Sequence, residues 1–420
     1  MFVFSELAPG LSFIFKFQAA PIVMRLTEIT AGAVLMLLIL CGATFLFGRF
    51  YCSFLCPLGI IQDVFILLSR RKGKTEKNLF LLRYLSAGIV AGLFAGGTNL
   101  GFLLLAPYSN AGRIFASYSA GGAAVLILLV IFAVWKQRIF CTALCPVGTI
   151  LGVISRFGIF RLKISDDCIH CGKCVKSCPA GCIDIRNNTI DDARCIRCMA
   201  CLSACPKQCI SFHPGRPEKI QSHERRRFLI SAGAFIAGAF SGIVFAKSNL
   251  FKSGKKLNIL PPGAGSPAVF ADKCTACMLC VVNCPSDIIV PSRHGMGVEI
   301  NFDNGFCLYT CNRCGNICPT GAVDALSLPE KRRVKIAEAN FDPRSCIAFQ
   351  ESKKCGLCGK ACPTGAITLR KNSTPRPVKK DLCIGCGACQ NVCPATKKAM
   401  TVSPIEYQKV LSDTTEGDEN

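Results

Sequence analysis

The sequence predicts an α-helical membrane domain joined to small α+β domains that are organised around cysteine-bound metal. The chain has 420 residues, of which 51% are hydrophobic and only 18% are charged, with a mean hydropathy of +0.40. This is too apolar for an ordinary soluble protein. It also has 31 cysteines, most of which recur as CxxCxxCxxxCP. A disulfide framework has no reason to repeat that spacing, whereas thiolate ligation of iron does.

Four stretches of 19–22 residues are apolar and free of charge, at 29–47, 84–105, 117–135 and 228–246. Each is long enough to cross a hydrocarbon core of about 30 Å as a helix. The alternative is a buried helix of a soluble protein. We therefore expect residues 1–160 to form a membrane domain with three spans. Residues 1–24 are apolar but interrupted, and are expected to form an interfacial or re-entrant segment.

Basic residues are concentrated after the first and third spans, whereas the loop between the second and third has only Arg113. The positive-inside rule then predicts a multi-pass protein of a bacterial-type inner (cytoplasmic) membrane. Residues 161–215 would lie in the cytoplasm, and residues after the fourth span would be periplasmic or extracytoplasmic.

The fourth predicted span belongs to a transmembrane helix expected over residues 222–247. The residues Glu224-Arg225-Arg226-Arg227-Phe228-Leu229 at its start are similar to a twin-arginine export signal. The alternative is the basic flank of a stop-transfer helix. Cleavage after Ala246 would release everything that follows.

Residues 161–215 contain two complete cysteine motifs with the spacing of a bacterial 2[4Fe-4S] ferredoxin-like fold. In that fold the fourth cysteine of each motif binds the cluster of the other motif. One cluster is expected to bind Cys168, Cys171, Cys174 and Cys205, and the other Cys195, Cys198, Cys201 and Cys178. Cys182, Cys209 and the mid-span Cys41 are interpreted as small apolar fillers.

A linker rich in glycine, proline, serine and lysine is predicted at 248–268, a second cysteine-rich domain at 269–402 and a disordered tail at 403–420. The second domain has four more motifs: Cys274, Cys277, Cys280 and Cys284; Cys307, Cys311, Cys314 and Cys318; Cys346, Cys355, Cys358 and Cys362; Cys383, Cys386, Cys389 and Cys393. The third motif can pair with the fourth and the fifth with the sixth, or the pairs can be nested. In one alternative, Cys346 is a bystander. About six [4Fe-4S] clusters are expected in all.

Two further cysteine pairs follow the first and third spans, Cys52 with Cys56 and Cys141 with Cys145. They belong to an internal repeat, because residues 49–61 and 138–150 are identical at seven of thirteen positions. The pairs can converge on one four-thiolate redox or metal site, form two disulfides, or have a structural role. The cytoplasmic side disfavours disulfides. Our hypothesis is a site that links the membrane domain to the clusters.

Several classes of function are not expected. The formal charge is +23, but six oxidised clusters would reduce it to about +11, so binding of nucleic acid is not predicted. None of the four histidines lies in a span, and CxxCH is absent, which argues against haem. No GxGxxG follows a predicted strand, so no flavin or nucleotide is expected. Electron relay is favoured over catalysis.

The motifs together resemble two types of electron-transfer protein. Residues 29–212 resemble the NapH type of membrane ferredoxin, whose membrane part is also similar to NosR. Residues 222–402 resemble the NapG/MauM type, an exported ferredoxin with four clusters. The resemblance implies a membrane-bound polyferredoxin that relays electrons from quinol, or another low-potential donor, to a periplasmic reductase. The alternatives are a maturation factor that keeps a partner metalloenzyme reduced, and a haem-free quinol dehydrogenase or a component of one.

Overall fold

The computed structural model describes residues 31–69, 79–98, 100–115, 120–215, 222–248, 257–292, 297–351, 354–371 and 373–411. These divide into two compact units, one within Phe13–Phe251 and one from Lys252 onward. We call them the N-terminal unit and the C-terminal unit. The segment predicted at 1–24 lies outside the described residues, as do residues 29–30, 99 and 117–119 of three predicted spans.

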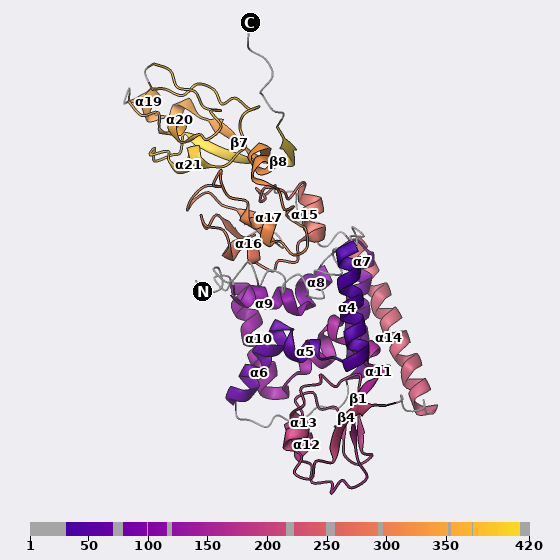
Figure 1. The fold of residues 1–420 in the computed structure, drawn as a ribbon. Helices are drawn as coiled ribbons and strands as arrows, with labels where there is room; N and C mark the ends of the chain where they lie inside the picture. Colours follow the sequence, from indigo (N-terminus) through magenta and orange to yellow (C-terminus); the bar gives the residue numbers. More distant parts are fainter. Residues whose placement is uncertain are drawn as a thin grey trace. The chain divides into compact units, whose positions relative to one another are not determined.

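Helices dominate the N-terminal unit (Figure 1). They are α4 Ala31–Phe47, α5 Tyr51–Phe54, α6 Pro57–Ser69, α7 Phe80–Ala95, α8 Leu100–Leu105, α9 Pro107–Phe115, α10 Ala120–Lys136, the π-helix η1 Phe140–Leu144, α11 Pro146–Arg156 and α14 Ser222–Lys247. All four predicted spans overlap helices. Among the described helices, only α14 contains a stretch long and apolar enough to cross a membrane, Arg226–Lys247.

The second predicted span, 84–105, is not one continuous helix. The structure divides it into α7, which ends at Ala95, and α8, which begins at Leu100. Gly96 and Gly97 lie at the break, and Gly97 has a φ of +83°. Glycine favours such left-handed backbone and weakens a helix by about 1 kcal/mol relative to alanine, which explains the interruption.

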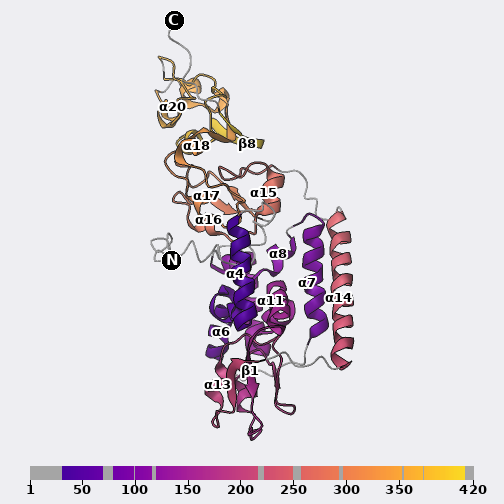
Figure 2. The ribbon, with the colours of Figure 1, turned by 45° about the vertical axis from the view of Figure 1, so that its right-hand side comes forward.

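Helices α7 and α14 run side by side in Figures 1 and 2. Glycines allow this close approach: a Cβ on Gly92 would lie 2.0 Å from the Ala239 carbonyl oxygen, and one on Gly238 would lie 2.5 Å from that of Leu85. Small residues at a helix interface are typical of membrane helix pairs, because packing of the backbones replaces the hydrophobic effect there.

A small α+β domain completes the N-terminal unit. Strands β1 Phe160–Ile164 and β4 Ile210–Pro214 pair in antiparallel fashion, as do β2 Ile183–Asp184 and β3 Thr189–Ile190. The short helices α12 Lys173–Ser177 and α13 Ala200–Ala204 pack against each other. The ring of Phe160 stacks on that of Phe47, 5.6 Å between centroids, so this domain contacts the end of α4.

The C-terminal unit has two more antiparallel strand pairs, β5 Ile289–Pro291 with β6 Val298–Ile300, and β7 Val334–Phe341 with β8 Met400–Val410. Its helices are α15 Pro267–Lys273, α16 Leu279–Val282, α17 Arg313–Ile317, α18 Leu328–Arg333, the 3-10 helix η3 Pro343–Ser345, α19 Ile347–Gln350, α20 Leu357–Ala361 and α21 Ala388–Asn391.

The boundaries of this unit differ from those predicted. Residues 403–410 of the predicted disordered tail instead belong to strand β8, which pairs with β7, and the rest of the predicted tail from 412 lies outside the described residues. The described part of the predicted linker, 257–268, is also ordered. The Gln408 side-chain amide donates a hydrogen bond of 2.8 Å to the Pro261 carbonyl, and the Gly263 amide donates one of 2.9 Å to the Gln408 side-chain oxygen. Strand and linker therefore hold each other in place, a long-range contact that local composition does not reveal.

Candidate metal centres

The cysteine loops share a local conformation that turns the chain around a cavity. The residue before the short helix is left-handed in five of the six motifs, at Gly172, Met199, Met278, Gly356 and Gly387. This reversal brings the third cysteine of each motif, which lies on that helix, back toward the first two. The fourth motif has an extra residue in its first gap, and its Asn312 keeps a negative φ of −133°.

Two cavities lie in the small domain of the N-terminal unit. The first is lined by Cys168, Cys171, Cys174 and Cys205, and the second by Cys178, Cys195, Cys198 and Cys201. Each cavity thus receives three cysteines from one motif and the fourth from the other. Cys209 and Cys182 also line the first and second cavity respectively, so each cavity has a fifth thiol.

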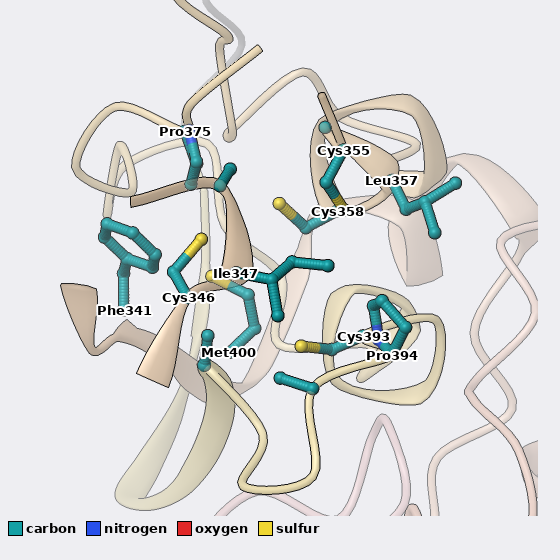
Figure 3. A pocket seen from close by; sticks show the side chains of 14 residues that line it. Phe341, Cys346, Ile347, Cys355, Leu357, Cys358, Pro375, Cys393, Pro394 and Met400 are labelled. Atoms are coloured by element: carbon teal, nitrogen blue, oxygen red, sulfur yellow. The ribbon is translucent and has the colours of Figure 1, made fainter. Parts of the chain in front are cut away.

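Two similar cavities lie in the C-terminal unit, where α20 packs against α21. One is lined by Cys346, Cys355, Cys358 and Cys393, and the other by Cys362, Cys383, Cys386 and Cys389. Figure 3 shows the first cavity, with Cys346, Cys358 and Cys393 around it together with Ile347 and Met400. Cys346 therefore lies among the other thiols rather than apart from them.

The third and fourth motifs also form a pair, because α16 packs against α17. The thiol of Cys280 interacts electrostatically with those of Cys274, Cys277 and Cys318. The thiol of Cys314 does so with those of Cys284, Cys307 and Cys311. Of the two pairings that the sequence leaves open, the structure adopts third with fourth and fifth with sixth.

The two motif pairs of the C-terminal unit are joined through cysteine backbones. The Cys307 amide donates a hydrogen bond of 2.8 Å to the Cys386 carbonyl, and the Ile336 amide donates one of 3.0 Å to the Ile384 carbonyl. The thiols of Cys307 and Cys386 also interact electrostatically. The Cys284/307/311/314 group therefore lies beside the Cys362/383/386/389 cavity, and the four groups follow one another in a series.

The chemistry of the donors fits a cluster better than a single ion. Zinc would require thiolates about 2.3 Å from one point. Among the described residues, no three histidine, cysteine, aspartate or glutamate side chains converge closely enough to hold one ion. Four thiols instead surround a cavity that is otherwise lined mainly by apolar side chains. An iron–sulfur cluster has several atoms inside its ring of thiolates, so these sites fit it.

Burial favours the protonated form of several cysteine thiols. It raises the pKa of Cys201 and of Cys389 to about 12 in each case, so both are protonated at neutral pH. Metal ligation must displace those protons. Cys178 differs, because a hydrogen bond from the Cys182 thiol lowers its pKa. The two sulfur atoms are 3.5 Å apart.

Sequence reasoning missed an ion-pair cluster beside the second cavity. Asp192 accepts hydrogen bonds of 2.8 Å from both Arg161 and Arg197, and all three side chains are largely buried. Asp192 lies three residues before Cys195, and Arg197 lies between Cys195 and Cys198. They fix the loop that presents these ligands. The sequence signal that could have revealed this ion-pair cluster is the presence of charged residues, Asp192 and Arg197, just before and within the cysteine motif.

The cysteines of the internal repeat, Cys52, Cys56, Cys141 and Cys145, are all buried, with exposed fractions of 4–6%. None of the 31 cysteines, all of which are described, forms a disulfide. The two disulfides considered from the sequence are therefore not formed in this structure.

Families of known domains match these regions. The family described as a 4Fe-4S binding domain matches residues 29–75 and 120–165. Three families described as 4Fe-4S dicluster domains match 160–206, 273–347 and 351–399. The chain contains 4Fe-4S ferredoxin-type domains. The boundary between the last two matches falls after Cys346, so that the earlier match includes the first cysteine of the fifth motif and the later match includes the other three.

Curated relatives match separate parts of the chain. It is 30% identical over 138 residues to the methylamine utilization ferredoxin-type protein MauN of Paracoccus denitrificans, covering 31% of this chain and 48% of MauN. It is 30% identical over 140 residues to the ferredoxin-type protein NapH of Haemophilus influenzae, covering 31% and 48%. The chain thus spans about half the length of these two relatives. It is 28% identical over 203 residues to the ferredoxin-type protein NapG of Escherichia coli, covering 44% and 87%.

Proposed function

We propose that this chain is a membrane-bound polyferredoxin that relays electrons from quinol, or another low-potential donor, to an extracytoplasmic reductase. Six cysteine quartets would each hold one [4Fe-4S] cluster. The observation that carries the proposal is the continuity of these sites: the hydrogen bond from Cys307 to Cys386 joins the two motif pairs of the C-terminal unit. A series of adjacent sites serves transfer of electrons, whereas a storage or purely structural role does not require it.

The clusters would supply one-electron redox chemistry whose potentials the protein adjusts through burial and hydrogen bonds to sulfur. The chain itself buries the thiols and excludes water. In the first ferredoxin domain, Cys171 is exposed whereas Cys195 and Cys201 are buried. The Cys168/171/174/205 site is therefore the one open to a soluble redox partner on that side.

We also propose that α14 remains part of the mature protein and holds the C-terminal unit at the membrane. A Cβ on Gly96 of the α7 end would lie 2.4 Å from Ala246 Cβ, so the residue after which cleavage was considered packs closely here. The multi-pass topology, with the first ferredoxin domain cytoplasmic and the second extracytoplasmic, belongs to this proposal. We propose in addition that the chain is a fusion of two parts. The first part is NapH-like, with a membrane core similar to that of NosR, and the second part is NapG-like.

The test uses the full-length protein in anaerobic proteoliposomes, with a menaquinol analogue as donor and a redox dye as acceptor on the opposite side. We expect dye reduction that Cys386→Ser largely abolishes and that Cys41→Ser, outside every quartet, leaves unchanged. Full cluster content without quinol-driven flux would contradict the relay. A partner reductase that stays active without this chain, once matured, would indicate the maturation role instead.

A further inference from the structure

The two membrane cysteine repeats fold into a reciprocal arrangement. Arg49 begins the first repeat, and its Nη2 donates a hydrogen bond of 3.1 Å to the carbonyl of Cys141 in the second. Arg138 begins the second repeat, and its Nη1 donates one of 2.9 Å to the carbonyl of Cys52 in the first. Each arginine therefore crosses to the first cysteine of the other repeat. This exchange ties both pairs into one structure.

The glycine of each repeat makes room for the crossed arginine. A Cβ on Gly59 would lie 2.4 Å from the Cys52 carbonyl oxygen and 3.4 Å from Arg138 Nη1. A Cβ on Gly148 would lie 2.6 Å from both the Cys141 carbonyl oxygen and Arg49 Nη2. A side chain at Gly148 would overlap both the crossed arginine and a cysteine carbonyl, whereas one at Gly59 would overlap the cysteine carbonyl and touch the arginine at normal contact distance. The repeated glycines thus have a physical role at this crossing.

Three of the four thiols interact with the same two arginines, and the fourth, Cys56, interacts with the other thiols. Arg49 interacts electrostatically with Cys52, Cys141 and Cys145, and its Nη2 lies 3.7 Å from Cys52 Sγ. Arg138 interacts with Cys141 and Cys52. Cys56 in turn interacts with the other three thiols. Both repeats therefore contribute thiols to one buried group.

This group contains more positive charge than the surrounding residues balance. Arg49 and Arg138 are completely buried, with exposed fractions of 0%. Arg138 is paired with Asp63, but no ion pair links Arg49 to a described carboxylate, and its Nε has no hydrogen-bond partner there. A buried cation without a counter-charge is costly by several kcal/mol. An anionic occupant would supply the missing counter-charge, whereas protonated thiols or disulfides would not.

We propose that Cys52, Cys56, Cys141 and Cys145 bind one iron–sulfur cluster between the two repeats, with Arg49 and Arg138 as crossed positioning residues that balance its charge. Four thiolates around such a cluster have a net charge of about −2 in the oxidised state. The site extends the proposed relay, and its role in electron transfer rests on that proposal. The binding of a cluster at this site does not depend on the relay and can be tested separately.

The position of this site indicates which cluster it would serve. Arg49 Nη1 and Arg83 Nη2 both donate hydrogen bonds of 2.9 Å to the Ala193 carbonyl, two residues before Cys195. Ser53, beside Cys52, donates one of 2.9 Å to the Ile196 carbonyl. Arg138 interacts electrostatically with Cys198. The membrane site is thus attached to the loop of the Cys178/195/198/201 cavity, which would be its redox neighbour.

The experiment compares full-length variants purified anaerobically in detergent. Iron and acid-labile sulfide are counted per chain, and reduced samples are examined by EPR. We expect wild-type protein to exceed the roughly 24 irons of six cubane clusters. Cys52→Ser and Cys141→Ser should each lose the same increment and the same EPR signal, with the six other clusters retained. Cys41→Ser is the matched control and should lose nothing.

Arginine variants supply a second readout that does not depend on removing a ligand. Arg49→Gln should shift the potential of the additional signal to more negative values, because a compensating positive charge is lost, and Arg49→Lys should restore most of that shift. The same iron content in wild type, Cys52→Ser and Cys141→Ser would overturn the proposal, as would one zinc lost in place of iron. A wild-type count of about 24 irons with all six other signals present would refute only this site. Colourless protein would instead refute the relay.

Discussion

Cys182 lies outside the quartets but forms a hydrogen bond with the thiol of Cys178, which belongs to one. Its sulfur lies 3.5 Å from that of Cys178 and donates a hydrogen bond to it. The corresponding positions after the fourth and fifth motifs are Ala322 and Ala366. Hydrogen bonds to a ligand sulfur stabilise the reduced cluster and raise its potential. The interpretation of Cys182 as an apolar filler therefore leaves out its main interaction.

We predict that Cys182→Ala lowers the midpoint potential of the Cys178/195/198/201 cluster without loss of iron. An EPR redox titration of the full-length protein measures this shift. Cys41→Ala removes a partly buried thiol that belongs to no quartet and serves as the control. Loss of four irons in Cys182→Ala would show instead that this residue is a ligand.

Asp192 is the shared counter-charge of two buried arginines beside the second cluster loop. We predict that Asp192→Asn destabilises the first ferredoxin domain by about 3–5 kcal/mol, because Arg161 and Arg197 would be left buried without their counter-charge. Thermal loss of the visible cluster absorbance measures it in the full-length protein. The exposed Asp166→Asn should change stability by less than about 0.5 kcal/mol. Equal effects of the two substitutions would contradict the assigned role.

Among the elements, α7 and α14 form a close pair in which glycines of each helix face the backbone of the other. We predict that Gly92→Leu destabilises this pair by about 1–3 kcal/mol or more, because the new side chain meets the Ala239 backbone. Gly233→Leu, in α14 with nothing within 4 Å of its Cβ position, is the matched control. Heat stability in detergent, followed by size-exclusion chromatography, compares them. If the control loses as much stability as Gly92→Leu, the close glycine packing is not what holds the helices.

The sequence predicts the elements better than it predicts their long-range partners. Helices occur at all four apolar stretches, since apolar length is a local property. The break at Gly97 was missed because glycine is common in membrane helices and its φ depends on the packed context. The extent of β8 was missed because local composition cannot reveal its pairing with β7, which lies 59 or more residues earlier in the chain.

Cysteine spacing likewise indicated the quartets but could not decide between two pairings of the last four motifs. That choice depends on contacts between α16 and α17 and between α20 and α21, which are distant in sequence. The sequence also could not predict the crossing of Arg49 and Arg138, although both residues belong to the internal repeat. Their hydrogen bonds to the opposite cysteine carbonyls exist only after the two repeats meet.

For the whole molecule, the relay requires that neighbouring clusters interact. We predict magnetic coupling between the Cys284/307/311/314 cluster and the Cys362/383/386/389 cluster in the EPR spectrum of the fully reduced protein, because the Cys307–Cys386 hydrogen bond joins their loops. Cys386→Ser should remove that coupling and simplify the spectrum. Cys355→Ser, in the last cluster of the series, should leave it. A spectrum that is the simple sum of isolated clusters would contradict the adjacency.

The central claim is that these thiols hold iron and inorganic sulfide, and metal analysis of the full-length protein tests it most directly. Protein purified without oxygen should be brown and contain at least about 24 irons with a matching amount of sulfide per chain. The visible absorbance should bleach on reduction. Colourless protein whose thiols bind zinc, or are consumed in disulfides, would contradict the account.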